Sequence, residues 1–346
     1  MRSLAPHYLA RLRLTPDHAA AQAAIAEYKG KQDLYREQTP EVLESLRTVA
    51  IIESSESSNR LEGIVAPKHR IEALVRQNTM PANRSENEIA GYRDALNLIH
   101  DSAPHMEFSA NVIKQLHDLL YRHLPGLGGN WKTTQNRIEE RGPDGSLIRI
   151  RFTPVEPVAV PQAMDDLDAL YHQALGSGGN PLLLIPLVVL DFLCIHPFTD
   201  GNGRTARLIT TLLLYHGGYE VGRYISLERI FEESRESYYD TLEASSAHWH
   251  QGRHDVMPWV DYFWGVLIKA YKELEDRVGA FDQGSKQARI EAAIERSTKP
   301  ISISELERIC PDVSRDWIRI VLRRLRDEGK IERRGKGRGA KWVKVG

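Results

Sequence analysis

Apolar residues recur every three or four positions along most of the first 280 residues, which is the periodicity of helices with one buried face. The clearest such stretch covers 112–120, and Ser109 just before it is a predicted N-cap. Other helices are predicted over 161–174 and 182–195, and a third ends at His216 before two glycines. The stretch 182–195 is so apolar that we expect it to be buried on every side, yet it is too short to cross a bilayer.

One segment alternates instead, as β-strands do. Ile148, Ile150 and Phe152 alternate with arginines, and Arg-Gly-Pro-Asp-Gly at 141–145 has the composition of a turn. The pattern therefore predicts a β-hairpin over 135–152. A hairpin of two strands is marginally stable alone, so we expect it to lean on the helical body.

The pattern changes again near 280–286, where Ala-Phe-Asp-Gln-Gly-Ser predicts a linker. Three short helices are predicted after it, over 286–297, 304–309 and 314–328, and a glycine-rich pair of strands follows over 330–345. The sequence thus predicts a mainly α-helical body followed by a small α+β domain.

Charge divides the chain in the same way. The whole sequence holds 46 Lys and Arg against 47 Asp and Glu, a net charge of −1, which argues against a uniformly basic nucleic-acid protein and a uniformly acidic disordered one. Residues 284–346 alone hold 17 basic and nine acidic residues, a net charge of +8, and the remainder carries −9. An acidic helical body thus precedes a basic domain, which keeps nucleic acid open as a partner.

Cysteine usage and the first residues exclude other classes of protein. Cys194 and Cys310 are too few for a disulfide scaffold or a four-thiolate zinc site, and we expect both to be buried. The first residues, Met-Arg-Ser-Leu-Ala-Pro-His, lack the apolar core of a signal peptide. We therefore expect a cytoplasmic protein with no membrane partner.

Candidate chemistry concentrates in residues 196–207, His-Pro-Phe-Thr-Asp-Gly-Asn-Gly-Arg-Thr-Ala-Arg, between the buried helix and the next one. Gly201 and Gly203 allow backbone N–H groups to converge at a helix N-terminus, and such an arrangement binds phosphate. Arg204 and Arg207 are three residues apart, so they share a helix face and can hold further phosphate oxygens.

Two more residues of this segment complete a reactive site. Asp200 offers a hard oxygen ligand suited to Mg²⁺, which takes one or two carboxylates together with phosphate oxygens. His196 titrates near neutrality and can take a proton from an attacking hydroxyl. The competing interpretation, an ordinary turn after a helix, fits a bare Asp-Gly-Asn-Gly better than it fits the whole segment.

The segment matches HPFxDGNGRxxR at all nine fixed positions and so resembles the signature of Fic-domain nucleotidyltransferases. The resemblance implies a Fic-type helical bundle over 106–280, with the hairpin as a flap that docks a protein target by strand pairing. It implies transfer of AMP from ATP, with Mg²⁺, to a Tyr, Thr or Ser hydroxyl of a target or of the chain itself. His196 would be the base and Asp200 the metal ligand. The residues that it assigns to ATP binding are Gly201, Asn202, Gly203, Arg204, Thr205, Ala206, Arg207 and Tyr239.

Two of these assignments have alternatives. Gly203 indicates the class, because phosphate-transferring relatives of the death-on-curing type carry Lys there and use ATP the other way round. Transfer of phosphate, or of another nucleotide, is the nearest alternative. Tyr239 is implied to lie beside the adenine, and its alternative is an aromatic residue packed within the helical body.

A second motif lies in the N-terminal helical region, 1–105. Residues 58–63, Ser-Asn-Arg-Leu-Glu-Gly, resemble the inhibitory motif [ST]xxxE[GN] of the same family through Ser58, Glu62 and Gly63. The resemblance pairs Glu62 with Arg207, where it would compete with the γ-phosphate and misalign ATP for attack at the α-phosphorus. The resemblance therefore implies a low basal activity and predicts that Glu62→Gly relieves the inhibition. In some relatives the same glutamate supports removal of AMP, which the sequence leaves open.

The basic domain, 285–346, resembles a winged helix. Residues 314–328 would be its recognition helix and 330–345 its wing, a workable combination for DNA. Dimerisation or target docking is an equally open use. A DNA-binding regulator that uses the Fic domain as an ATP sensor is therefore the alternative from another class. Relatives with this layout often form dimers, so a homodimer is also open.

Overall fold

The computed structural model describes residues 3–38, 40–77, 79–124, 126–142, 144–297, 300–310, 313–335 and 340–344. The chain separates into two compact units, Met1–Leu274 and Glu275–Gly346. The finer division into 1–105, 106–280 and 285–346 stays a prediction. No helix in these described ranges combines the length and apolarity needed to cross a membrane.

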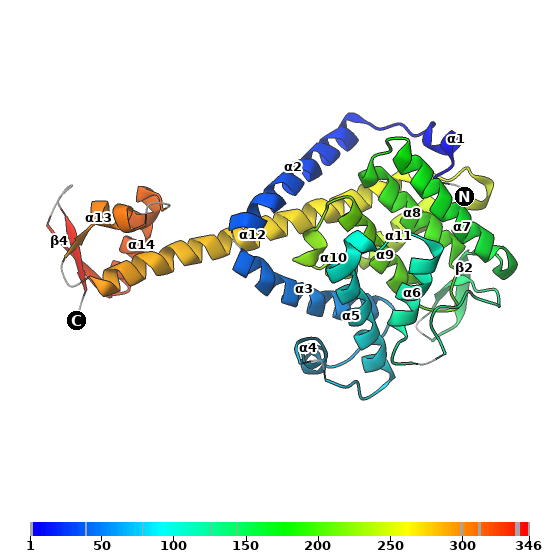
Figure 1. The fold of residues 1–346 in the computed structure, drawn as a ribbon, viewed down its shortest axis with the longest axis horizontal. Coiled ribbons are helices and arrows are strands. Elements are labelled where there is room, and N and C mark those ends of the chain that lie inside the picture. Colours follow the sequence, from blue (N-terminus) through cyan, green and yellow to red (C-terminus); the bar gives the residue numbers. More distant parts are fainter. Residues whose placement is uncertain are drawn as a thin grey trace. The chain divides into compact units, whose positions relative to one another are not determined.

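The first unit is built almost entirely from helices, as predicted (Figure 1). They are α1 (Pro6–Leu9), α2 (Pro16–Gln38), α3 (Pro40–Leu61), α4 (Lys68–Arg76), α5 (Arg84–Ser102), α6 (Ala110–Leu120), α7 (Val160–Gly176), α8 (Pro181–Ile195), α9 (Asn202–His216), α10 (Leu227–Glu233), α11 (Arg235–Ser246) and α12 (Met257–Arg296), which continues into the second unit. Short 3-10 helices occupy several of the connections.

The apolar helix α8 lies in the core, where it packs against α7, α9 and α11. Its position has a cost, because Pro186 lies inside the helix and leaves the carbonyl of Leu182 without its helical donor. The indole N–H of Trp264, on α12, donates to that carbonyl at 2.8 Å. A second indole of α12, that of Trp259, donates to the Pro186 carbonyl at 2.9 Å. The Trp264 bond replaces the donor that the proline removes, and both bonds tie α12 to the buried helix that leads to the candidate site.

The alternating segment forms the predicted hairpin. Strand β1 (Ile138–Arg141) pairs antiparallel with β2 (Leu147–Phe152), and Ile138 lies opposite Phe152. Pro143 of the predicted turn lies outside the described residues. The hairpin leans on α11, since Arg151 lies 3.5 Å from the carboxylate of Glu243.

The second unit contains β3 (Ile301–Ser302), α13 (Ile303–Ile309), α14 (Arg315–Asp327), β4 (Ile331–Arg334) and β5 (Lys341–Lys344). The strands form an antiparallel sheet in the order β3-β5-β4. The apolar stripe of α14 closes a core with Leu306 and Trp342, and Trp317 packs against it. Residues 336–339 and 345 of the predicted wing lie outside the described residues.

The predicted linker at 280–286 is wrong, because α12 runs without a break from Met257 to Arg296. Gly284 is the strongest helix breaker in that stretch, and one interior glycine costs only about 1 kcal/mol relative to alanine. The remaining residues of a long helix absorb that cost. The predicted helix 286–297 is therefore the end of α12.

Candidate active site

The loop between α8 and α9 has two features that shape the site. His196 ends α8 in the left-handed conformation, with φ 50° and ψ 62°, which costs a non-glycine residue on the order of 1 kcal/mol. The side chain of Asn202 then closes the loop, because it accepts from the N–H of Phe198 at 2.9 Å and donates to its carbonyl at 2.8 Å. The imidazole is thus held at the beginning of a tightly closed loop.

The loop delivers an open helix N-terminus. Gly201 is the N-cap of α9 with φ 78°, and no side chain caps the helix. Only glycine fits this position well, because an added Cβ would lie 3.0 Å from the Tyr121 hydroxyl as well as in the left-handed region. The first N–H groups of α9 and its positive dipole end therefore remain available to an anion.

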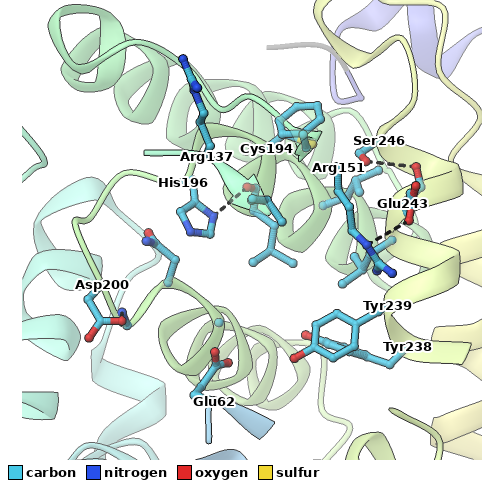
Figure 2. Close-up of a pocket in the computed structure, with 18 of the residues that line it drawn as sticks. Glu62, Arg137, Arg151, Cys194, His196, Asp200, Tyr238, Tyr239, Glu243 and Ser246 are labelled. Atoms are coloured by element: carbon cyan, nitrogen blue, oxygen red, sulfur yellow. Dashed lines mark hydrogen bonds and ion pairs between the residues drawn. The ribbon is translucent and has the colours of Figure 1, made fainter. Parts of the chain in front are cut away.

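This helix end faces a cavity of roughly 290 Å³ (Figure 2). Figure 2 shows Glu62 pointing into it from one side, His196 and Asp200 on another, and Tyr238 and Tyr239 on a third. The lining residues are Glu62, Arg137, Ile138, Arg151, Phe152, Leu190, Leu193, Cys194, His196, Thr199, Asp200, Gly201, Asn202, Gly203, Arg207, Tyr238, Tyr239, Leu242, Glu243 and Ser246. Most of the predicted site residues are thus brought together.

His196 is held as a neutral imidazole. Its Nδ1 lies 3.2 Å from the carbonyl of Leu193, and because a carbonyl only accepts, Nδ1 carries the proton. Burial lowers the pKa of His196 to about 4, opposed by the Leu193 carbonyl and assisted by the charge of Lys132. At neutral pH the Nε2 lone pair is therefore free to accept a proton.

Asp200 is an ionised carboxylate at the cavity. The Tyr121 hydroxyl donates to its Oδ2 at 2.9 Å, and the N–H of Gly201 donates to its Oδ1 at 2.7 Å. Burial raises the pKa of Asp200, but the Tyr121 hydrogen bond and the charge of Arg204 outweigh it, so the pKa lies below its ordinary value.

Glu62 and Arg207 form the ion pair that the sequence resemblance implied. Arg207 is 2% exposed, and its Nη2 donates to Glu62 Oε1 at 2.8 Å. Ser58 holds the same guanidinium twice, through its hydroxyl to Nε and its carbonyl to Nη2, both at 2.8 Å. Gly63, with φ 77°, turns the chain directly after Glu62. The carboxylate lies so close to Gly203 that an added Cβ there would overlap Glu62 Oε1. Glu62 therefore occupies the position in front of α9 where an anion would bind.

Arg204 does not face the cavity. It is 1% exposed and donates to Glu88 at 2.7 Å, to Asn59 at 3.3 Å and to the Tyr121 hydroxyl at 2.8 Å. The shared-face argument placed both arginines on the phosphates, but the carboxylate of Glu88, on α5, draws Arg204 inward. The phosphate contact predicted for Arg204 has no geometric support here.

Thr205 and Ala206 also lie away from the cavity. Both are buried, and the Thr205 hydroxyl donates to the Gly201 carbonyl at 2.9 Å. Tyr239, by contrast, lines the cavity, and its hydroxyl donates to the carbonyl of Leu61, at the end of α3, at 3.3 Å. The tyrosine thus contacts the segment that carries Glu62.

Several residues of the site have no signal in the sequence. Tyr121 and Glu88 organise Asp200 and Arg204, and Lys132 lies beside the loop of His196. Arg151 and Glu243 meet at the cavity wall from the flap and α11. Only the alternation of the flap, which predicts which arginines share one face, pointed toward any of them.

Comparison with known proteins identifies the central part of the chain. Residues 107–214 match the Fic/DOC family. The protein adenylyltransferase fic-1 of Caenorhabditis elegans is 28% identical over 206 residues, which cover 58% of this chain and 35% of that protein. The protein adenylyltransferase Fic of Drosophila willistoni is 31% identical over 136 residues, covering 38% and 25%. The chain thus spans about a third of the length of the curated relatives it matches first.

Solved structures show the same fold. The crystal structure of a Fic family protein from Desulfovibrio desulfuricans G20 superposes with a TM-score of 0.62 at 22% identity, covering 97% of this chain and 98% of that one. Fic-1 (aa134–508) from C. elegans superposes with a TM-score of 0.59 at 21% identity, covering 77% and 74%. Residues 107–214 of this chain are therefore a Fic domain of the Fic/DOC family.

Proposed function

We propose that this protein is an adenylyltransferase that moves AMP from ATP to a hydroxyl of a protein, and that Glu62 restrains it. One observation carries the proposal: a neutral histidine and an uncapped helix N-terminus face the same cavity, and a carboxylate bound to Arg207 occupies the anion position between them. The names of the relatives, protein adenylyltransferases, support the choice of AMP as the transferred group.

The proposed reaction follows from these groups. Nε2 of His196 takes the proton of a target hydroxyl, and the hydroxyl oxygen forms a bond to the α-phosphorus. The bond from the α-phosphorus to the bridging oxygen breaks, and its electron pair leaves on pyrophosphate. The N–H groups at the start of α9 stabilise negative charge on the phosphates. Arg207 would bind the outer phosphate once Glu62 has moved away.

The residues present fit Mg²⁺. Asp200 is ionised and lies at the cavity, its side chain is 68% exposed, and each of its oxygens accepts one hydrogen bond, which leaves a lone pair for a metal ion. The described residues hold no group of three or more acids, histidines or cysteines that could bind a metal, which suits an ion that arrives with phosphates. When bound, Mg²⁺ would be held by Asp200 with phosphate oxygens and would neutralise charge on the departing pyrophosphate.

Gly203 supports AMP transfer over phosphate transfer. A lysine there, as the phosphate-transferring relatives carry, would collide with the Glu62 carboxylate through its Cβ. The target protein would pair with the flap, where Ile148 and Ile150 of β2 are exposed.

ATP labelled at the α- or the γ-phosphate tests the proposal. The wild type, Glu62→Gly and His196→Ala are incubated with Mg²⁺ and a cell extract, and the label on protein is measured. We expect α-label with Glu62→Gly, little with the wild type and none with His196→Ala. Label from the γ-phosphate on protein would contradict AMP transfer. If protein labelled by Glu62→Gly loses its α-label when the wild type is added, the wild type also removes AMP.

A DNA-binding winged helix in Glu275–Gly346 is a second candidate. The strand order β3-β5-β4, with α14 before its last two strands, favours it, and Arg323 on α14 is exposed. Other arginines of α14 pair with nearby carboxylates, among them Arg315 with Glu307 at 2.7 Å. We expect binding of the full chain to duplex DNA to weaken steeply with salt and to fall in Arg323→Ala. Sedimentation of the same samples tests the homodimer.

A further inference from the structure

A buried lysine lies beside the loop of His196. Lys132, between α6 and the flap, is 2% exposed. Its Nζ donates to Asn136 Oδ1 at 2.8 Å and lies 3.5 Å from the carbonyl of Ile195. In the described part of the chain no carboxylate pairs with it, and burial lowers its pKa to about 8. Burial of an ammonium group without a counter-ion costs folding free energy, so we expect this lysine to have a function.

The segment 132–136 holds the loop on both sides of His196. The N–H of Lys132 donates to the carbonyl of Pro197 at 2.8 Å. The side-chain amide of Asn136 donates to the carbonyl of Phe198 at 2.9 Å. With the contact from Nζ to Ile195, the carbonyls on either side of the histidine are each bound by this segment. These contacts support the left-handed backbone that His196 adopts.

We propose that Lys132 is a positioning residue for His196: its ammonium and backbone N–H, with Asn136, fix the loop so that Nε2 faces the cavity. The inference rests on the proposed function, because it assumes that Nε2 accepts the proton. Lys132 does not line the cavity, so it acts through His196 and not through the nucleotide.

The charge of Lys132 has a second effect on His196. Burial is the main cause of the lowered pKa of His196, and Lys132 lowers it further, whereas Glu62 and Asp200 act in the opposite direction. Removal of the ammonium therefore raises the pKa of His196. Because the imidazole must be unprotonated to accept a proton, the acid limb of kcat/KM then moves to higher pH.

Kinetics in the Glu62→Gly background tests this role with Lys132→Met, Lys132→Arg, Asn136→Ala and, as a control, exposed Lys272→Met. We expect Lys132→Met to lower kcat at least tenfold, to change the KM for ATP less than twofold and to move the acid limb upward. Lys132→Arg should return the acid limb of kcat/KM to the pH of the parent. Asn136→Ala should lower kcat and leave the pH of the acid limb unchanged. Lys272→Met should match the parent.

Two results would overturn the proposal. One is a Lys132→Met enzyme whose kcat stays within twofold of its parent. The other is a Lys132→Met enzyme whose kcat and KM change together while the acid limb of kcat/KM stays at the same pH. Thermal unfolding checks that each variant folds. If Lys132→Met does not fold, Asn136→Ala and Lys132→Arg take its place in the kinetic comparison. The titration of His196 by NMR, assigned with His196→Ala, needs no activity. We expect the pKa of His196 to rise in Lys132→Met and to stay at the parent value in Lys132→Arg, which keeps the charge. An unchanged pKa of His196 in Lys132→Met would overturn the electrostatic part. If the Glu62→Gly parent transfers nothing, the proposed function fails, and the NMR titration still decides whether Lys132 acts on His196.

Discussion

Two arginines one turn apart on α9 form ion pairs whose carboxylate partners differ in their exposure to solvent. Arg204 and Arg207 are equally buried, and each pairs with a glutamate. The partner of Arg204, Glu88, is itself only 5% exposed, whereas the partner of Arg207, Glu62, is 33% exposed and lies at the cavity. In the proposed function an incoming phosphate replaces Glu62, whereas Glu88 is too buried for such an exchange. Burial of the arginine therefore does not distinguish a structural ion pair from an exchangeable one. The exposure of the carboxylate that pairs with the arginine distinguishes them.

The largest expected effect is the loss of stability in Glu88→Ala. The substitution removes the closer carboxylate of a buried guanidinium and leaves it only Asp200, at 3.8 Å, so we expect the free energy of unfolding to fall by about 3 kcal/mol. Glu62→Ala should cost about 1 kcal/mol, because Arg207 lines the cavity and water can take the place of the partly exposed carboxylate. Urea unfolding of both variants measures the difference. Equal losses would break the comparison.

Activity should respond in the opposite order. Glu62→Gly opens the anion position, and we expect AMP transfer to rise about 10- to 100-fold, equivalent to about 1.4 to 2.7 kcal/mol. Glu62→Gln should give an intermediate rise if charge as well as bulk restrains the enzyme. Glu88→Gln, measured beside them with α-labelled ATP, should give no rise. Activation by that variant would assign inhibition to the wrong arginine.

Ser58 sharpens the comparison at Arg207. Ser58→Ala removes the acceptor of Nε, which we expect to cost about 1 to 2 kcal/mol of stability, because the donor is charged and buried. Basal transfer should rise only a few-fold, since the ion pair to Glu62 remains. Thermal unfolding and labelling on the same preparations separate the two effects, and a rise as large as that of Glu62→Gly would show that Ser58 is the principal restraint.

The smallest effect is expected from Tyr239→Phe. It removes a single hydrogen bond of 3.3 Å to the Leu61 carbonyl, worth about 0.5 kcal/mol. Basal transfer should roughly double, and ATP binding, measured by calorimetry in the Glu62→Gly background, should stay the same because the ring remains. A tenfold loss of ATP affinity would instead place the hydroxyl on the nucleotide.

Much of the fold followed from local pattern. The spacing before 112–120 predicted the N-cap at Ser109, whose hydroxyl accepts from the N–H of Val112 at 3.2 Å. Alternation predicted the hairpin, and continuous apolarity predicted the burial of α8. Each of these depends on residues close together in the chain, so sequence alone contains the information. The linker was missed because a single glycine weighs little against the rest of a long helix.

The site was less accessible to local reasoning. The segment 196–207 indicated which chemistry to expect, but the direction of Arg204 is decided by Glu88, which is 116 residues away. Lys132 is set beside His196 by a loop that crosses from another helix. Such pairings depend on how helices dock, and no periodicity records them.

Gly203 limits the routes by which this chain could change under selection for higher activity. A substitution at 203 displaces Glu62, because even a methyl group overlaps its carboxylate. The same methyl group would project into the anion position, so in the proposed function the loss of the Glu62 restraint and damage to ATP binding would occur together. Substitutions at 58 or 62 carry no such penalty. Activated variants recovered from random mutagenesis should therefore cluster at the end of α3 and leave the glycine unchanged.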